Sequence, residues 1–441
     1  MTQVCDFSDK TILPSDIEFK GYEEVIVQDI KVITNNTLFR KKVYYSKSLK
    51  KSFTAPLPQG YKGSFGPNIK AMIVGLKYIG NMSEPKILEL LKHNKILISS
   101  GTISNIIVDE SKKFDDEKRS IIRSGIESSV YTQIDDTGSR VKGKNHHTHI
   151  MTNENFVSFD TKEKKNRQVI IEVLMNGEEL KYLLNESSFE IAKKLKVGKK
   201  AIATLEKLKS EKFYTKKQFE KLLFDNFANI PAYLLHKIMD TAAISYYRNQ
   251  NKTPIISTLV CDDAHQFKDI NNNLALCWVH EARMYKKLTP LVPQFMKIKS
   301  QYINDFWLFY ETLFKYKKNP TDYCINNISQ QFDDLFSIET GYKELDKIKK
   351  RTMRKKALLL TVLKVPKVPL HNNRAELGAR AQVRKRDISL HTMSAVGTKA
   401  MNIFMTVVET AKILKVNPLE YLYDRISGKK IMPSLATIIN N

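Results

Sequence analysis

Three acidic residues that are far apart in the sequence could together hold divalent metal ions. Asp135 follows the strand-like run Tyr131-Thr-Gln-Ile134, and Asp262 follows the similar run Leu259-Val-Cys261. Glu376 lies about one turn inside a predicted helix. Phosphodiester chemistry near neutral pH uses two divalent ions about 3.5–4 Å apart, which clamp the attacking and leaving oxygens. Mg²⁺ (or Mn²⁺) prefers hard oxygen ligands and keeps several waters, so three carboxylates on rigid elements suffice for two ions.

Neighbouring residues help to assign roles within this set. Each aspartate is followed by a second acid, Asp136 or Asp263, and successive strand residues point to opposite faces. We therefore expect only the first acid of each pair to face the metal ions. Arg380 lies four residues after Glu376 on one helix face, where it could hold the carboxylate. Taken singly, an acid at a strand end is more often a cap or turn residue, and that alternative stays open for each.

Further polar residues are expected to support the site. Cys277 and His280 have a spacing that could bind metal, but a zinc site would need two more ligands. The alternative, which we favour, is a packed cysteine and a hydrogen-bonded histidine. Asn372 and Asn373 open the helix of Glu376 and are expected to support it. Basic residues after that glutamate are expected to contact DNA phosphates, namely Arg380, Arg384, Lys385 and Arg386.

Strands and helices alternate along the chain in a way that frames these residues. Strands are predicted over 130–134, 146–159, 168–175, 255–261 and 274–279. Helical periodicity covers 68–128, 178–250, 283–365, 372–384 and 392–415. The order predicts an α/β (α+β) protein with an RNase H-like mixed β-sheet, flanking helices and helical insertions. Such sheets bind ligands at strand ends, where the aspartates are expected.

The composition indicates a globular protein with a polyanionic partner. The 441 residues are 42% hydrophobic, and the formal net charge is +25. Each phosphate that such a protein neutralises releases counterions, so DNA is the leading partner. A membrane surface is a weaker interpretation, and lysine enrichment from an AT-rich genome is the alternative without function. The four cysteines are scattered, and no signal peptide or long apolar run is present, so we expect a cytoplasmic, nucleoid-associated protein.

The first third of the chain is predicted to contain two smaller modules. Strand-like runs at Glu24–Val27 and Lys42–Tyr45 indicate a β-containing module, which ends near the breaks at Pro56, Pro58 and Gly60. Two short helices over 83–92 and 102–108 then fit a helix-turn-helix. An ordinary helical hairpin is the alternative.

Five motifs, in this order, resemble the insertion-sequence-66 family of DDE transposases over about residues 22–425. They are Asp135-Asp-Thr-Gly-Ser139, Asp262-Asp-Ala264, Cys277-Trp-Val-His-Glu-Ala-Arg283, His371-Asn-Asn-Arg-Ala-Glu-Leu-Gly-Ala-Arg380, and Glu409-Thr-Ala-Lys412 with Pro418-Leu-Glu-Tyr-Leu422. The resemblance implies that Asp135, Asp262 and Glu376 are the catalytic, metal-binding triad. It also implies an RNase H-like domain, two Mg²⁺ (or Mn²⁺) ions, and the transposon ends and target DNA as substrates.

The chain departs from the family pattern at four places. Only Cys5 lies near the family's zinc-binding module, so a zinc site of four cysteines cannot form. The coiled coil that often precedes that module is absent. The spacing of 127 residues between the first two acids is about twice the spacing expected. Leu377 replaces the arginine that follows the last acid.

These observations divide the chain into four predicted parts. They are a module over 1–60 resembling a degenerate zinc-binding domain, a helix-turn-helix-like DNA-binding region over 61–128, an RNase H-like catalytic domain over 129–425 with helical insertions at about 185–250 and 284–365, and a C-terminal tail over 426–441.

The sequence thus predicts a transposase that cleaves transposon-end phosphodiester bonds and transfers the 3′-hydroxyl to target DNA. We expect a homo-oligomer on DNA, with accessory proteins of the same element as further candidate partners. A catalytically inactive DNA-binding relic and an RNase H-like nuclease without strand transfer are the alternatives. Nicking in Mg²⁺ or Mn²⁺ separates the first of these from an enzyme, and transfer of a labelled end separates the second.

Overall fold

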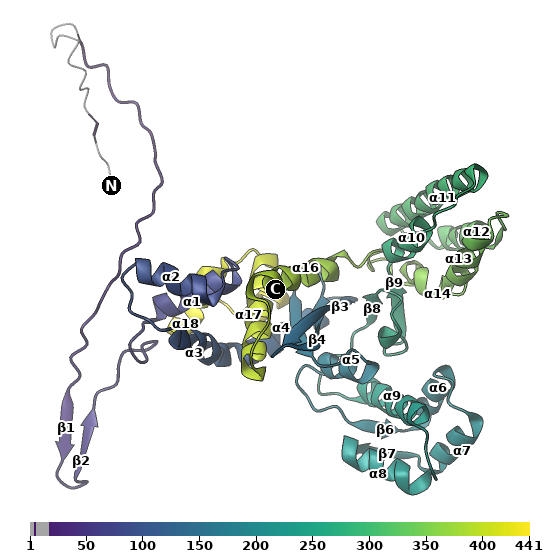
Figure 1. The fold of residues 1–441 in the computed structure, drawn as a ribbon, viewed down its shortest axis with the longest axis horizontal. Coiled ribbons are helices and arrows are strands. Elements are labelled where there is room, and N and C mark those ends of the chain that lie inside the picture. Colours follow the sequence, from purple (N-terminus) through teal and green to yellow (C-terminus); the bar gives the residue numbers. More distant parts are fainter. Residues whose placement is uncertain (1–3, 6–16) are drawn as a thin grey trace.

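A five-stranded mixed sheet forms the centre of the structure, a computed structural model that describes residues 4–5 and 17–441 (Figure 1). Its strands are β3 (Thr132–Val141), β4 (Lys144–Thr152), β5 (Val157–Lys162), β8 (Thr258–Cys261) and β9 (Asn273–Leu276), in the spatial order β5-β4-β3-β8-β9. Strands β3, β4 and β5 form an antiparallel meander, whereas β8 and β9 run parallel to β3. The mixed α/β class predicted from the sequence is confirmed.

Three of the strand predictions need correction. The first strand continues to Val141, because it pairs with β4 along its whole length, so Asp135 lies within a strand and not at its end. The run 146–159 forms two strands, broken at 153–156. The run 168–175 is helix α5 (Arg167–Leu174). Its β-branched residues favour a strand, but Ile170, Ile171 and Leu174 are buried with helical spacing and Asn166 caps the helix.

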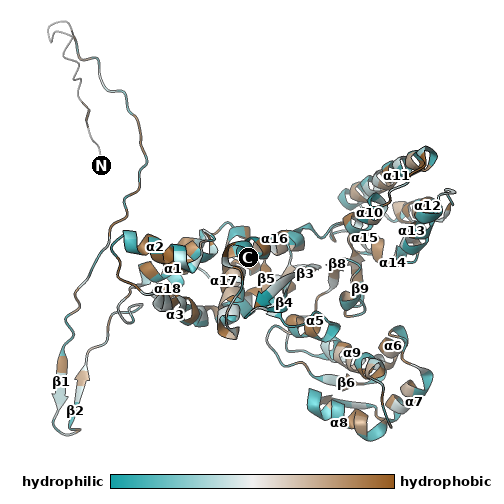
Figure 2. Ribbon diagram, in the orientation of Figure 1, coloured by the Kyte–Doolittle hydropathy of each residue, from teal (hydrophilic) through white to brown (hydrophobic). Residues whose placement is uncertain are grey.

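Helix α17 (Ala395–Ile413) covers the free edge of the sheet. The helix is buried over most of its surface and is pale to brown over much of its length in Figure 2. The Thr410 hydroxyl accepts a hydrogen bond from Val157 N at 3.2 Å, and the Thr406 hydroxyl accepts one from Phe159 N at 3.1 Å. Both amides belong to β5, so the helix satisfies backbone donors that an open sheet edge would leave unpaired.

Helices from both ends of the chain pack together on one side of the sheet (Figure 1). They are α1 (Pro67–Tyr78), α2 (Glu84–His93), α3 (Ser100–Ser111), η2 (Lys112–Phe114), α4 (Asp115–Glu127), α16 (Asn373–Ser389), α18 (Pro418–Ser427) and α19 (Leu435–Asn440). Helix α1 contacts α18, and α4 contacts α19. The predicted C-terminal tail therefore contains a helix that packs on the body.

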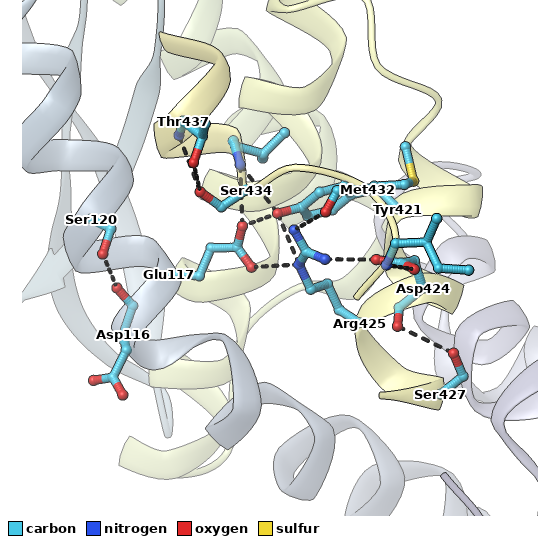
Figure 3. Close-up of polar contacts among 12 residues, drawn as sticks. Asp116, Glu117, Ser120, Tyr421, Asp424, Arg425, Ser427, Met432, Ser434 and Thr437 are labelled. Carbon is cyan, nitrogen blue, oxygen red and sulfur yellow. Dashed lines mark hydrogen bonds and ion pairs between the residues drawn. The ribbon is translucent and has the colours of Figure 1, made fainter. Parts of the chain in front are cut away.

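A buried polar network joins α4 to the C-terminal helices (Figure 3). The Arg425 guanidinium is 3.3 Å from Glu117 and 2.6 Å from Asp424, and it donates to Met432 O at 3.0 Å. The Tyr421 hydroxyl donates to the same glutamate. All three charged side chains are nearly buried, so each depends on the others for compensation.

Arg425→Ala should lower the free energy of unfolding by about 3–5 kcal/mol, because it leaves two buried carboxylates without their cation. Arg119→Ala on α4 is the control, since Arg119 is half exposed and 3.5 Å from Asp115, and a surface pair contributes about 0–1 kcal/mol. Denaturant unfolding monitored by circular dichroism measures both. Similar losses in the two variants would contradict the importance of the network.

Two segments are inserted into the sheet region. The first holds α5, β6 (Tyr182–Leu184), α6 (Glu186–Lys194), α7 (Lys199–Lys207), β7 (Ser210–Tyr214), α8 (Lys216–Asn226) and α9 (Ala232–Asn249). The second, which follows η3 (His265–Phe267) and β9, holds α10 (Trp278–Lys286), α11 (Pro293–Lys318), α12 (Asp322–Ser337), α13 (Lys343–Met353), α14 (Lys356–Leu359) and α15 (Thr361–Lys364). No helix in the described part of the chain is long and apolar enough to cross a membrane.

The N-terminal region extends away from the body (Figure 1). Strand β1 (Val43–Ser46) pairs with β2 (Lys51–Thr54) in an antiparallel hairpin, which confirms the strand predicted at 42–45. The predicted strand at 24–27 is wrong: those residues pair with no strand among the residues that the structure describes, and Ile26 is 93% exposed. Helices α2 and α3 match the predicted helical pair, but six residues, 94–99, join them. The helix-turn-helix interpretation of this pair stays a prediction.

Candidate active site

Asp135 and Asp262 occupy equivalent positions on adjacent parallel strands. Gln133 of β3 is in register with Val260 of β8, and each aspartate lies two residues further on. Adjacent strands are about 4.8 Å apart, and residues two apart share a face. Asp262 directly follows the end of β8, as predicted, whereas β3 continues beyond Asp135 to Val141. The register therefore brings the two aspartates together where β8 ends.

Side chains from β3 and α16 fix the helix start beside these aspartates. The Gln133 side chain donates to His371 O at 3.2 Å and accepts from Arg374 N at 3.0 Å. The Asn372 side chain, which is fully buried, donates to Ile134 O at 2.8 Å. Glu376 lies one turn into α16, so these bonds set its position relative to β3. Asn372 thus supports the site in the structure, while Asn373 is the exposed first residue of the helix.

Cys277 joins three elements of the site and is not arranged as a ligand. Its amide donates to Cys261 O at 3.0 Å, and its sulfur accepts from Asn372 N at 3.3 Å. Burial raises the pKa of the thiol, so it stays protonated near neutral pH. These contacts favour the packed cysteine over the metal ligand.

Glu376 is held by Arg283, which is itself bonded to His280. The Arg283 guanidinium is 3.2 Å from one carboxylate oxygen of Glu376 and 3.3 Å from the other. Arg283 also donates to His280 Nε2 at 2.8 Å. Because that nitrogen must accept, the imidazole is neutral and carries its proton on Nδ1, which lies 3.7 Å from Glu376. Burial and the charge of Arg283 both lower the pKa of His280, consistent with the neutral ring.

The prediction that Arg380 holds Glu376 is wrong, because Arg283 pairs with this glutamate. Arg380, which the helical spacing favoured, is exposed and forms no ion pair among residues 17–441. Arg283 takes this role because α10 and α16 bring it near, although it is 93 residues away in sequence. The motif Cys277-Trp-Val-His-Glu-Ala-Arg283 contains it, but no spacing rule connects that motif to the helix of Glu376. Gln133 was missed for the same reason.

The four aspartates divide into two with cationic partners and two without. Asp136 is 3.3 Å from Lys165, and Asp263 lies 2.7 Å from Lys268 and 3.3 Å from Lys355. Neither Asp135 nor Asp262 forms an ion pair within the described ranges; they accept only backbone hydrogen bonds, from Asp136 N at 2.8 Å and Ala264 N at 3.0 Å.

The electrostatics of Asp135 fit a group that lacks a counterion. Burial raises the pKa of Asp135 to about 7, with further contributions from the charges of Asp262, Asp136 and Glu376, while its hydrogen bond from the Asp136 amide opposes the shift. The three acids predicted to act together are thus close enough to influence one another. A bound cation would relieve this repulsion.

The carboxylates do not form a ready-made metal cage. Over residues 4–5 and 17–441, no three His, Cys, Asp or Glu side chains are grouped so as to hold a metal ion. Glu376 is instead paired with Arg283. The oxygen ligands nevertheless suit Mg²⁺ or Mn²⁺ in type, and no cationic side chain of the described residues is paired with Asp135 or Asp262.

The basic residues of α16 fall into three environments. Arg380 and Arg384 are exposed, where a phosphate could reach them. Arg386 donates to Gly138 O at 2.6 Å and so ties α16 to β3. Lys385 is 1% exposed, donates to Lys77 O and lies over the Tyr78 ring. The predicted phosphate contact of Lys385 is therefore wrong for this structure, because the side chain points into the helical layer.

Lys385→Met should change how stability depends on pH. Burial and the nearby Lys77 lower the pKa of Lys385 to about 7, whereas an unfolded lysine has a pKa near 10.4. Between these values the unfolded chain binds more protons, so the lysine makes the wild type gain stability as pH rises from about 7 to 10. As pH rises from about 7 to 10, the unfolding free energy of the wild type should therefore increase relative to that of the variant. Urea unfolding at several pH values measures it, and a constant difference would refute the depressed pKa.

Comparisons with known proteins agree with the motifs at this site. The profile of a family described as "Transposase IS66 family" matches residues 231–400, which include Asp262, Cys277, His280 and Glu376. A protein from Sinorhizobium fredii (strain NBRC 101917 / NGR234), "Uncharacterized protein y4jO", is 31% identical over 324 residues. That alignment covers 72% of this chain and 99% of the relative.

Proposed function

Because this chain belongs to the IS66 family of transposases, we propose that it cleaves phosphodiester bonds at transposon ends and joins the resulting 3′-hydroxyl to target DNA. The observation that carries this proposal is the paired placement of Asp135 and Asp262 on β3 and β8, without cationic partners. We propose DNA, both transposon ends and target, as the partner, and the nucleoid as the place of action. Self-association on DNA and accessory proteins of the element complete the proposal.

We assign the sheet to an RNase H-like catalytic domain. The support is the order β5-β4-β3-β8-β9, in which an antiparallel meander continues into two parallel strands. The same order places β8 against β3, so it is the fold that unites two aspartates 127 residues apart. The remaining proposed parts are the N-terminal module over 1–60, the helical DNA-binding region over 61–128 and the C-terminal tail.

Asp135, Asp262 and Glu376 would hold Mg²⁺ or Mn²⁺, as two ions per site. When bound, such ions polarise the scissile phosphate and stabilise the charge on the attacking and leaving oxygens. Glu376 would join the aspartates once it leaves Arg283, and the freed guanidinium could then face a phosphate. Arg380 and Arg384 are exposed on α16, the helix of Glu376, and are proposed to contact the DNA backbone.

A catalytically inactive DNA-binding protein is the second candidate. The observation in its favour is the Glu376–Arg283 pair, which already neutralises one of the three acids. The test uses a labelled duplex that carries the terminus of the element encoding this chain. Specific 3′-end cleavage in Mg²⁺ or Mn²⁺, followed by joining of the labelled end to a plasmid, is expected of the transposase. DNA binding without nicking in either metal would favour the inactive protein.

A further inference from the structure

Helices α6 and α7 of the first insertion have the geometry of a second, distinct DNA-reading unit. Four residues, 195–198, join the two helices. Within this turn Lys196 has φ 55°, the left-handed conformation that ends a helix and redirects the chain. Leu195 N and Val197 N bond back to Ile191 O and Ala192 O at 2.9 Å each. A turn of three to four residues between two short helices is characteristic of a helix-turn-helix.

The inner faces of both helices are fixed by apolar packing. The buried side chains are Phe189, Ile191, Ala192, Leu195, Val197, Ala201, Ile202 and Leu205. Helix α6 also packs against α9, which anchors the unit to the rest of the insertion. One face of α7 therefore packs in this core, and its opposite face is exposed.

The free face of α7 is basic. Lys199, Lys200, Ala203 and Lys207 are exposed, and none of these lysines forms an ion pair within the described part of the chain. Glu206 is the one acid of the helix. Lys199 and Lys200 stand at the first two positions, the end of a recognition helix that meets base edges in this motif.

The residues around α7 extend this basic surface. Between residues 186 and 212 there are eight lysines and four glutamates, an excess of four positive charges in 27 residues. That density is more than twice the average of the chain, which already carries +25. Strand β7 follows α7 and exposes Lys212 and Phe213. Figure 1 shows α6, α7 and α8 at the outer end of the insertion, where a long rigid partner could approach.

We propose that α6 and α7 form a helix-turn-helix that binds duplex DNA, with α7 in the major groove. The major groove admits a helix, and the lysines of α7, which form no ion pair in the described part of the chain, match the phosphates on both sides of it. The insertion that separates Asp135 from Asp262 would therefore supply a DNA contact remote from the acids. This inference goes beyond the proposed chemistry and holds whether or not the chain cleaves DNA.

The test measures DNA binding by the full-length chain in the presence of a metal chelator. Duplexes with a randomised centre are selected for binding, and affinities for selected and unselected duplexes are then measured by fluorescence anisotropy at several salt concentrations. For Lys199→Ala/Lys200→Ala we expect at least a tenfold loss on selected duplexes and a clearly smaller loss on unselected ones, since side chains that meet base edges contribute to sequence reading. For Ala203→Glu we expect a similar loss, because the added carboxylate would face the DNA.

A matched control is Lys217→Ala/Lys221→Ala, which removes two exposed lysines from α8 in the same insertion. It should weaken binding less than threefold and leave the selected sequence unchanged. Equal losses in the two double variants, or unchanged affinity and selection in both α7 variants, would overturn the proposal. Asp135→Asn should select the same sequence as the wild type, so a failure of the cleavage proposal would be seen separately.

Discussion

Asp135→Asn, Asp262→Asn and Glu376→Gln should each lower DNA cleavage by about three orders of magnitude or more, while DNA binding stays nearly unchanged. Each substitution keeps the shape of the side chain but removes the charge that would hold a divalent cation. Binding rests on many lysine and arginine contacts to phosphates, so one lost carboxylate has little effect on it. End-labelled duplex cleavage in Mg²⁺ and Mn²⁺ measures the first quantity, and anisotropy in a chelator measures the second.

Asp136→Asn and Asp263→Asn are the matched controls, because each is the direct neighbour of a proposed ligand. Asp136 already bonds Lys165 and Gln266, and Asp263 is paired with two lysines. Burial raises the pKa of Asp263, but Lys268 and Lys355 outweigh it and hold that pKa below its usual value. Cleavage should fall by no more than about 10–100-fold, the usual range for a supporting contact and well short of the loss expected at the ligands. Equal losses for both members of a pair would contradict the assignment of ligands.

The local part of this site could be predicted from sequence, because it depends on short patterns. The strand before Asp262 and the helix start at Asn372 both follow from residue type and spacing. The strand predicted over 168–175 is wrong, because a short run of β-branched residues fits a buried strand and a buried helix equally well. Helix α5 is decided by packing against α9, which is distant in sequence.

The contacts that unite the site could not be predicted, because they join residues far apart in the chain. The register between β3 and β8 aligns Asp135 with Asp262. It depends on how the first insertion, which separates the two strands in sequence, folds outside the sheet. Arg283 reaches Glu376 only because α10 and α16 meet in space. Sequence spacing favoured Arg380, a neighbour on the same helix, and one sequence contains nothing that reports the competing contact.

Gly378→Val should lower cleavage by about 10²-fold, the largest effect we expect from a residue that touches neither DNA nor metal. Gly378 lies two residues after Glu376, where α16 crosses the sheet. A Cβ atom there would lie 2.7 Å from Ile150 Cγ2 and 3.3 Å from Val157 Cγ2. Both neighbours are buried, so the helix itself must shift, and a displacement of about 1 Å at a reacting group costs about 10²-fold in rate. Overpacking should also lower the unfolding free energy by about 1–3 kcal/mol.

A pair of glycine-to-alanine variants separates the close helix–sheet approach from helix propensity. Alanine favours a helix interior over glycine by about 1 kcal/mol wherever its methyl group has space. Gly101 is the second residue of α3, and the nearest atom to an added Cβ there is 4.0 Å away, so Gly101→Ala should stabilise the protein, by less than the interior value. Gly378→Ala should destabilise it and reduce cleavage, with Leu377→Ala at the exposed neighbouring position nearly silent in both assays. If Gly378→Ala stabilises the chain as Gly101→Ala does and leaves cleavage intact, α16 is free to move from β4, and the position of Glu376 is not set by this contact.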